Sequence, residues 1–149
     1  VAEGLSIAYR VDTDQFTAVI TKQLYDSWKV SLTEIHEAAV ANLFASHITV
    51  AHLNTVYMVE SDTEFGSAVI GYASFLEELH RSVMKDSFYI LPVSCEVAAL
   101  IPEREVTDME SVFKTAVTMF RSAKEMYMRP VTQEVYLFDG KMIKRCERT

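Results

Sequence analysis

The residues of this 149-residue chain best suited to metal binding or proton transfer are its four histidines, His36, His47, His52 and His80. His36 precedes Glu37, as in the zinc-protease pattern, but that pattern needs a second histidine one helical turn later, where this chain has Val40. Between His47 and His52 no Cys, Asp or Glu completes a coordination sphere. The spacing therefore predicts no metal site and no bound cofactor.

Cys95 is the one candidate nucleophile, and it precedes Glu96 in a predicted turn. No histidine lies near it in the sequence to activate the thiol. Phosphate-binding glycine motifs and the Gly-x-Ser-x-Gly motif of hydrolases do not occur in a chain with 4 glycines. These observations predict a protein without catalytic residues. The alternative is a host enzyme or small-ligand domain whose site forms only in space, from Cys95, Glu96, His36 and His52.

The formal net charge of -7 is unevenly distributed. Residues 1–120 contain 7 Lys and Arg against 17 Asp and Glu, whereas residues 121–149 contain 7 against 4. An acidic body repels phosphate backbones, so direct binding to nucleic acid is disfavoured. The same charge favours a protein partner with a basic surface.

The hydrophobic fraction of 50% is sufficient for one folded domain over residues 1–149. Only 4 Gly and 3 Pro occur, so no linker or domain boundary is predicted. No segment has the ~18 uninterrupted apolar residues of a membrane helix, and no leader pattern is recognisable. We expect a cytoplasmic protein of a bacterial host cell, with Cys95 and Cys146 as free thiols or, alternatively, a disulfide. Because the chain begins with Val1, it is compatible with a trimmed or partial sequence.

The elements that position these residues are predicted from the hydrophobic periodicity. Alternating apolar residues and intervening turn formers predict four strand pairs: 5–11 with 16–21, 53–60 with 67–72, 88–93 with 97–101, and 135–138 with 141–143. The last pair flanks Asp139-Gly140, a sequence that is typical of a type I′ hairpin turn.

Three capping boxes predict the starts of three helices: Ser31 with Glu34, Ser74 with Glu77, and Thr107 with Glu110. After the third box, apolar residues recur at spacings of three, four and seven, which favours an amphipathic helix. Hairpins and helices thus alternate along the chain. The fold class predicted is α+β, with one antiparallel sheet of successive hairpins and three main helices packed mainly on one of its faces.

A partner-binding surface is expected near the end of the third helix and in nearby acidic segments. Methionine and tyrosine are adaptable contact residues, and a cluster of them precedes Arg129, although they also suit packing against the final hairpin. Glu103 and Glu105 lack the helix-dipole role that explains the acidic residues following them. The candidate partner-binding residues are Asp62, Glu64, Glu103, Glu105, Met126, Tyr127, Met128 and Arg129.

Four segments also carry a family resemblance: residues 5–11, residues 20–24 leading to Trp28, residues 32–39, and above all 88–94. Together they resemble an uncharacterised bacterial family, a domain of unknown function common in gut anaerobes. Members are usually longer at the N-terminus, so the resemblance implies a shortened stand-alone form. In the family a Leu-Pro-Ser-Ser turn leads into Ile-His-Glu-Val, whereas this chain has Cys95-Glu96-Val97 without the histidine. The family implies a fold and leaves the function open.

The acidic balance, the missing motifs and the small size together predict a non-catalytic protein-binding module. One hypothesis is a phage or mobile-element inhibitor of a bacterial defence nuclease of the CRISPR effector class, in which the acidic body occupies a cationic channel. Its partner would be a basic nucleic-acid-handling enzyme. A further alternative is a homodimeric scaffold domain that associates through its Met- and Tyr-rich surface.

Overall fold

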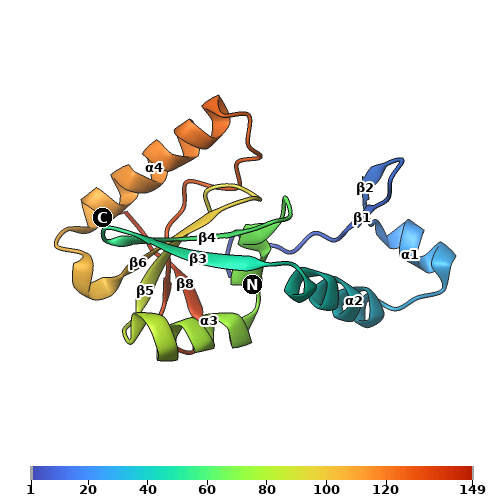
Figure 1. Ribbon diagram of the computed structural model, residues 1–149, viewed down its shortest axis with the longest axis horizontal. Helices are drawn as coiled ribbons and strands as arrows, with labels where there is room; N and C mark the ends of the chain where they lie inside the picture. The colour runs from blue at the N-terminus through green and yellow to red at the C-terminus, as the bar shows by residue number, and fades with distance from the viewer. Residues whose placement is uncertain (1, 149) are drawn as a thin grey trace.

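A computed structural model describes residues 2–148 as a twisted antiparallel sheet with helices around it and a smaller lobe at one end (Figure 1). The elements are β1 (Arg10–Asp12), β2 (Thr17–Val19), α1 (Lys22–Trp28), α2 (Leu32–Ala45), β3 (Ile48–Leu53), β4 (Val56–Ser61), the 3₁₀ segment η1 (Gly66–Gly71), α3 (Ala73–Leu79), the π-helical turn η2 (His80–Met84), β5 (Phe88–Leu91), β6 (Ala98–Pro102), the 3₁₀ turn η3 (Glu103–Glu105), α4 (Met109–Glu125), β7 (Tyr136–Phe138) and β8 (Ile143–Arg145).

The main sheet has the strand order β3-β4-β6-β5-β7-β8, and every neighbouring pair is antiparallel. The separate hairpin β1-β2 forms a two-stranded sheet of its own. The predicted α+β class with an antiparallel sheet is therefore confirmed. None of the helices over residues 2–148 has the length and apolar character needed to cross a membrane.

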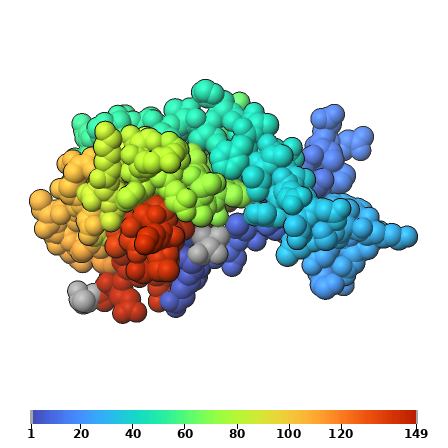
Figure 2. Space-filling model, turned by 90° about the horizontal axis from the view of Figure 1, so that it is seen from below, coloured from blue at the N-terminus to red at the C-terminus, as the bar shows by residue number. Residues whose placement is uncertain are grey.

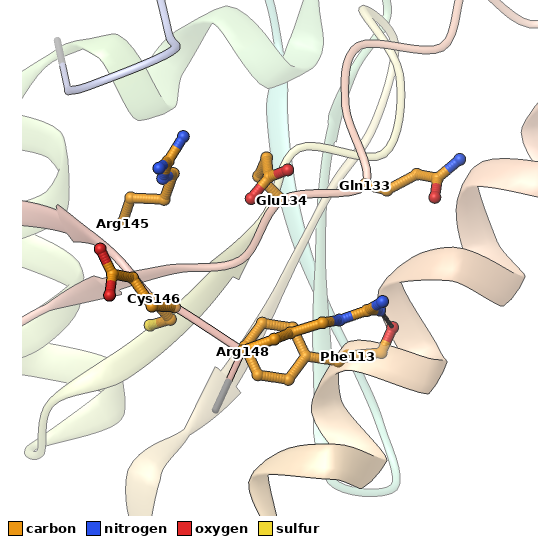
Figure 3. Close-up of a pocket in the computed structure, with 7 residues that line it drawn as sticks. Phe113, Gln133, Glu134, Arg145, Cys146 and Arg148 are labelled. Carbon is orange, nitrogen blue, oxygen red and sulfur yellow. Dashed lines mark hydrogen bonds between the residues drawn. The ribbon is translucent and has the colours of Figure 1, made fainter.

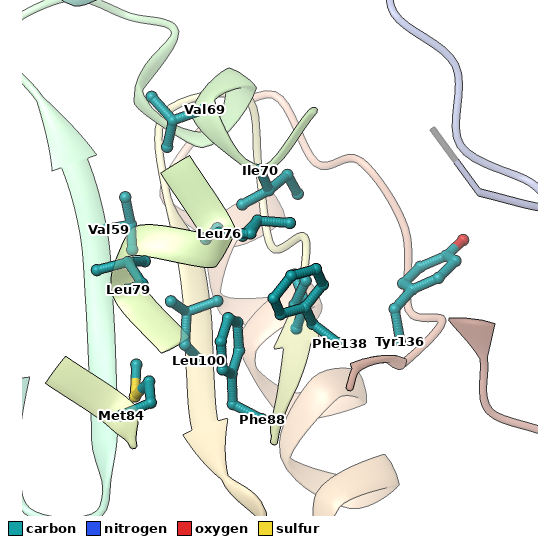
Figure 4. Packing of buried hydrophobic residues seen from close by; sticks show 12 residues of the cluster. Val59, Val69, Ile70, Leu76, Leu79, Met84, Phe88, Leu100, Tyr136 and Phe138 are labelled. Atoms are coloured by element: carbon teal, nitrogen blue, oxygen red, sulfur yellow. The ribbon is translucent and has the colours of Figure 1, made fainter. Parts of the chain in front are cut away.

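Helices cover both faces of the sheet, so the prediction that they pack mainly on one face is wrong. Phe88 and Ile90 of β5 face α3 and η1, where they pack with Leu76 (Figure 4). Tyr89 and Leu91 point to the other face, where α4 covers them. All four β5 residues are buried, which is the pattern of a strand covered on both sides rather than on one.

The second hairpin lies earlier in the chain than predicted. β3 pairs with β4 across the turn Asn54-Thr55, where Asn54 adopts a positive φ of 57° that Asn tolerates well. Residues 67–72 do not form a strand; most of them belong to η1, which begins at Gly66, where the chain passes close to its neighbours. A Cβ there would lie 2.5 Å from the Ser61 nitrogen and 2.6 Å from the Glu96 carbonyl oxygen. The apolar residues that follow enter the core from η1 instead.

The third and fourth predicted hairpins are confirmed as the pairs β5-β6 and β7-β8, with small shifts of their ends. The last turn is not type I′, which needs two consecutive positive φ angles. Only Gly140 has one, at 90°. Instead the Asp139 carboxylate accepts the backbone N–H groups of Lys141 and Met142 at 3.1 and 3.0 Å, which closes a longer loop.

One of the three predicted capping boxes is confirmed. The Ser31 hydroxyl accepts the Glu34 N–H, and the Glu34 carboxylate accepts the Ser31 N–H at 2.8 Å. In α3 the predicted cap Ser74 lies inside the helix, which begins without a side-chain cap.

The cap of α4 is Asp108 rather than Thr107. Its two carboxylate oxygens accept the N–H groups of Glu110 and Ser111, both at 3.1 Å. The prediction was wrong by one residue because Thr and Asp both suit this position, and only the backbone geometry selects between them.

Replacing Asp108 by Ala removes both cap hydrogen bonds, so we expect the free energy of unfolding to fall by about 1 kcal/mol. Urea denaturation followed by circular dichroism measures this change. Thr107→Ala is the matched control, since the Thr107 side chain caps nothing in the structure. A larger loss for Thr107→Ala than for Asp108→Ala would contradict the assignment.

Candidate functional site

The N-terminal lobe, defined as residues 10–45, contains β1, β2, α1 and α2 and projects from one end of the molecule (blue to cyan in Figure 2). A groove of about 360 Å³ runs between the hairpin and α2. It is lined by Tyr9, Arg10, Val11, Asp12, Ile20, Trp28, Val30, Glu34, Ile35, Ala38, Ala39 and Asn42. We call this the lobe groove.

Local structure explains how the groove forms. One face of α2 contributes Ile35, Ala38 and Ala39, which follow each other at helical spacing. α1 ends at Trp28, and the next residue, Lys29, has a left-handed conformation (φ 58°) that reverses the chain. The groove thereby receives a wall of small side chains on α2 and an indole from the end of α1.

The apolar side chains of the lobe are unusually exposed. Ile35 is the only apolar residue of the lobe that is buried, at 9% exposure. Phe16 is 56% exposed, Leu32 52% and Trp28 45%, although these residue types normally occupy a core. None of these three is among the partner-binding residues predicted from the sequence. Phe16 and Trp28 precede the helix predicted to begin at Ser31, so no helical periodicity in the sequence could have shown that they are exposed.

Aromatic contacts attach the lobe to the main body. The Tyr9 hydroxyl lies 2.7 Å from His36 Nδ1, and the His36 ring stacks on Tyr72 with centroids 5.7 Å apart. Phe44 meets Tyr72 edge-on at 5.6 Å and Phe75 at 6.3 Å. His36 therefore has a structural position at the joint between lobe and sheet.

A second contact continues from the groove to the main body through Phe65. Arg10, which lines the groove, lies 5.5 Å from the centroid of the Phe65 ring, and Arg129 lies 4.9 Å from the same centroid. Arg129 also donates through Nε to Glu96 at 2.9 Å and through Nη2 to the Glu64 carbonyl at 2.6 Å. Its Nη2 lies 3.2 Å from the Glu64 carboxylate. We call Phe65, Arg129, Glu96 and Glu64 the Arg129 cluster.

The turn that carries Cys95 is fixed by hydrogen bonds. The buried Ser94 hydroxyl accepts the N–H groups of Glu96 and Val97 at 3.2 Å. The Cys95 N–H donates to the Arg129 carbonyl at 2.8 Å, and the Ser67 hydroxyl donates to the Cys95 carbonyl at 2.9 Å. Burial by itself raises the pKa of Glu96, but hydrogen bonds from Arg129 and Ser94 outweigh it and hold that pKa below its usual range.

The structure brings together only part of the candidate set named from the sequence. Glu64 and Arg129 form an ion pair, and Asp62 accepts the His47 N–H at 3.1 Å near the start of β3. Glu103 and Glu105 lie in η3, which precedes α4. Met126, Tyr127 and Met128 follow the C-terminal end of α4.

The methionine and tyrosine cluster after α4 is divided between surface and core. Met126 is 71% exposed and Tyr127 is 97% exposed, whereas Met128 packs against the core cluster beneath α4. Tyr127 has a positive φ of 58°, which turns the chain after the end of α4.

The hypothesis of an enzyme site around Cys95 and His36 gains no supporting contact. His36 is engaged with Tyr9 and Tyr72, and His52 stacks on Tyr57 with centroids 4.2 Å apart. Within residues 2–148 no hydrogen bond or ring contact joins Cys95 to a histidine, and no group of three or more His, Cys, Asp or Glu is arranged to hold a metal ion.

A second cavity, of about 380 Å³, lies between α4 and the C-terminal segment (Figure 3). Arg148 lies 5.0 Å from the centroid of the Phe113 ring and donates to the Phe113 carbonyl at 3.5 Å. Arg145 and Glu134 add one charge of each sign to the lining. Burial raises the pKa of the Cys146 thiol, which leaves less reactive thiolate at neutral pH. Both cysteines are free and half-buried.

Comparison of the chain with known protein families, with curated proteins and with solved structures finds no match. The resemblance to the gut-anaerobe family therefore stays a prediction.

Replacing Glu96 by Gln keeps the side-chain size but removes the charge that Arg129 pairs with. We expect the free energy of unfolding at neutral pH to fall by about 1–2 kcal/mol. Because the folded-state pKa of Glu96 is lowered, its contribution is complete above the unfolded pKa of about 4.3 and is lost as pH falls through the folded value. The wild type should therefore lose more stability than Glu96→Gln on acidification.

Urea denaturation at a series of pH values from neutral to about 3 measures this difference. Glu37→Gln is the control, because Glu37 is exposed and makes no ion pair with any other described residue. Parallel stability curves for the wild type and Glu96→Gln would contradict the role assigned to the ion pair.

Proposed function

We propose that this chain is a non-catalytic protein-binding module whose lobe groove receives an apolar segment of a partner protein. The observation that carries the proposal is the mismatch between apolar content and burial in the lobe. Phe16, Trp28 and Leu32 stay about half exposed, and Ile35 is the one apolar residue there that is buried. Several large apolar side chains left exposed in one small lobe, one of them lining a groove, favour an interaction site.

A protein segment fits this surface better than a small molecule does. The groove volume of about 360 Å³ is near the lower end of the ~300–1,000 Å³ range of ligand pockets. However, the exposed side chains of Phe16, Val19 and Leu32 are not part of the groove lining. A ligand confined to the groove would leave them in water, whereas a polypeptide extending beyond the groove covers them as well.

The charges of the lobe indicate what flanks the apolar segment of the partner. Residues 10–45 contain five carboxylates and three cations. Lys22 is paired with Asp26 at 2.6 Å, so it does not neutralise the groove. Asp12 and Glu34 lie in the groove lining itself, whose single cation is Arg10, which lies over the Phe65 ring. Complementarity therefore favours an aromatic or aliphatic anchor between Lys or Arg residues.

This partner chemistry is compatible with the more specific proposal of an inhibitor of a basic nucleic-acid enzyme, such as a CRISPR-type defence nuclease. In that case the lobe would contact a cationic surface of the nuclease and oppose its binding to nucleic acid. The net charge of -7 supports this form through faster association with a cationic partner.

Trp28 gives a direct test because it is the only tryptophan in the chain and it lines the groove. Synthetic peptides with a Phe-Leu core between Lys-rich flanks should shift Trp28 fluorescence to shorter wavelength in a saturable way. Ala38→Arg, which fills the groove, should abolish the shift. Ala41→Arg is the matched control, because Ala41 is an exposed residue of the same helix outside the groove.

The same peptides with Glu-rich flanks should bind more weakly, because the groove rim is acidic. Equal shifts for the wild type and Ala38→Arg, or no saturable shift with any peptide, would count against the proposal. Purified RNA-guided nucleases assayed with the wild type and Ala38→Arg test the inhibitor form. The inhibitor form is supported only if the wild type and Ala41→Arg inhibit the nuclease and Ala38→Arg does not.

A further inference from the structure

The strand β3 forms one edge of the main sheet and has an unusually regular backbone. All six of its residues pair in register with β4, from Ile48 with Ser61 to Leu53 with Val56. Among residues 2–148, no turn or side-chain hydrogen bond reaches a backbone group of Ile48–Leu53 from its other side. The segment that contains β3 lies along the outer margin of the molecule (teal in Figure 2). Its outward N–H and C=O groups are therefore open to another strand.

The opposite edge of the sheet, β8, has features that prevent pairing with another strand, whereas β3 lacks them. β8 has only three residues, two of which are Lys144 and Arg145. Short length and charge are common means of preventing edge-to-edge pairing. β3 is twice as long and contains no charged residue, no proline and no bulge.

We propose that the β3 edge pairs with the β3 edge of a second copy of this chain, in antiparallel orientation, so that two sheets join into one. A two-fold axis near Val50 or Ala51 makes the strand its own partner. With the axis at Ala51, Val50 faces His52 of the second copy and Thr49 faces its Leu53. No charged side chain opposes another across this seam.

Side chains next to the edge add apolar area to this pairing. Ala51 is opposite Met58 and Leu53 is opposite Val56, so these four lie on the same face of the sheet. Leu53 is 59% exposed, and Met58 and Val56 are only partly buried. The two-fold axis places Ala51, Leu53 and their neighbours on β4 beside the same residues of the second copy. Leu53 then approaches Thr49 and Ala51 of the second chain.

A second copy is the occupant that the surface favours over a foreign extended segment. Foreign strands are selected by side-chain pockets along the edge they join. The two cavities described above lie in the lobe and beside α4, and neither includes a residue of β3. The edge offers only backbone groups and the apolar side chains next to it, which are complementary to the same side chains of a second copy. This surface is separate from the lobe groove, so either proposal can fail without the other.

Analytical ultracentrifugation across a concentration series tests the pairing. The wild type should move from 16.9 kDa toward twice that mass as concentration rises. Thr49→Lys with Leu53→Lys should remain monomeric, because like charges then face each other across the seam. Thr49→Glu with Leu53→Glu should behave in the same way. An equimolar mixture of the two double variants should restore the dimer, since opposite charges then meet.

Rescue in the mixture separates a real interface from a variant that fails to fold. Thr118→Lys with Ser122→Lys adds the same charge to the exposed surface of α4 and should dimerise like the wild type. A wild type that stays at the monomer mass at every concentration would overturn the inference. So would dimers of undiminished strength in both double variants, because association would then use another surface.

Discussion

The rest of the structure depends on the burial of β5 and β6 from both sides. Their nine residues are all buried, and their side chains alternate between two separate hydrophobic clusters. Each cluster needs a helical cover, because apolar groups on an open sheet face would remain in water. α3 with η1 provides one cover and α4 the other. The two faces of the sheet are therefore covered by helices that follow β4, whereas α1 and most of α2 lie outside the main sheet.

The lobe is the consequence of that arrangement. α2 reaches the main core only through its C-terminal part, where Leu43 packs against the cluster under α3. The rest of α2 packs beside a hairpin of two three-residue strands and the seven residues of α1, which are too few to enclose a core. Apolar side chains that a larger partner layer would bury therefore remain at the surface. Arg10 and Arg129 both lie over the Phe65 ring, and Arg129 is hydrogen-bonded to Glu96 and Glu64, so Arg10 connects this exposed lobe to the body.

The sequence predicted elements well where a local pattern determines them and poorly where distant segments do. The Ser31 capping box, the hairpin β5-β6 and the long helix α4 follow from short-range spacing, and the structure confirms them. Residues 67–72 have the composition of a strand, but the structure places most of them in a 3₁₀ segment that begins where Gly66 passes close to Ser61 and Glu96. No pattern in either segment alone contains that contact.

The same distinction explains the candidate sites. Glu64 and Arg129 were named from composition, but their ion pair joins residues 65 positions apart and needed the fold to be seen. The lobe groove was not predicted, because many of its lining residues are apolar types that normally form a hydrophobic core and carry no other signal. An exposed apolar surface of this kind has no sequence motif, and it becomes visible only from the exposure of Trp28 and Phe16 in the folded chain.

The two proposed surfaces would reinforce each other if both are used. A groove of about 360 Å³ accommodates a small anchor and by itself supports only modest affinity. Pairing through β3 would place two such grooves on one particle, since β3 follows α2 directly in the chain. A partner with two matching segments would then bind the second one intramolecularly, which raises overall affinity without any new contact. The exposed apolar lobe and the unprotected sheet edge would then serve the same proposed binding function.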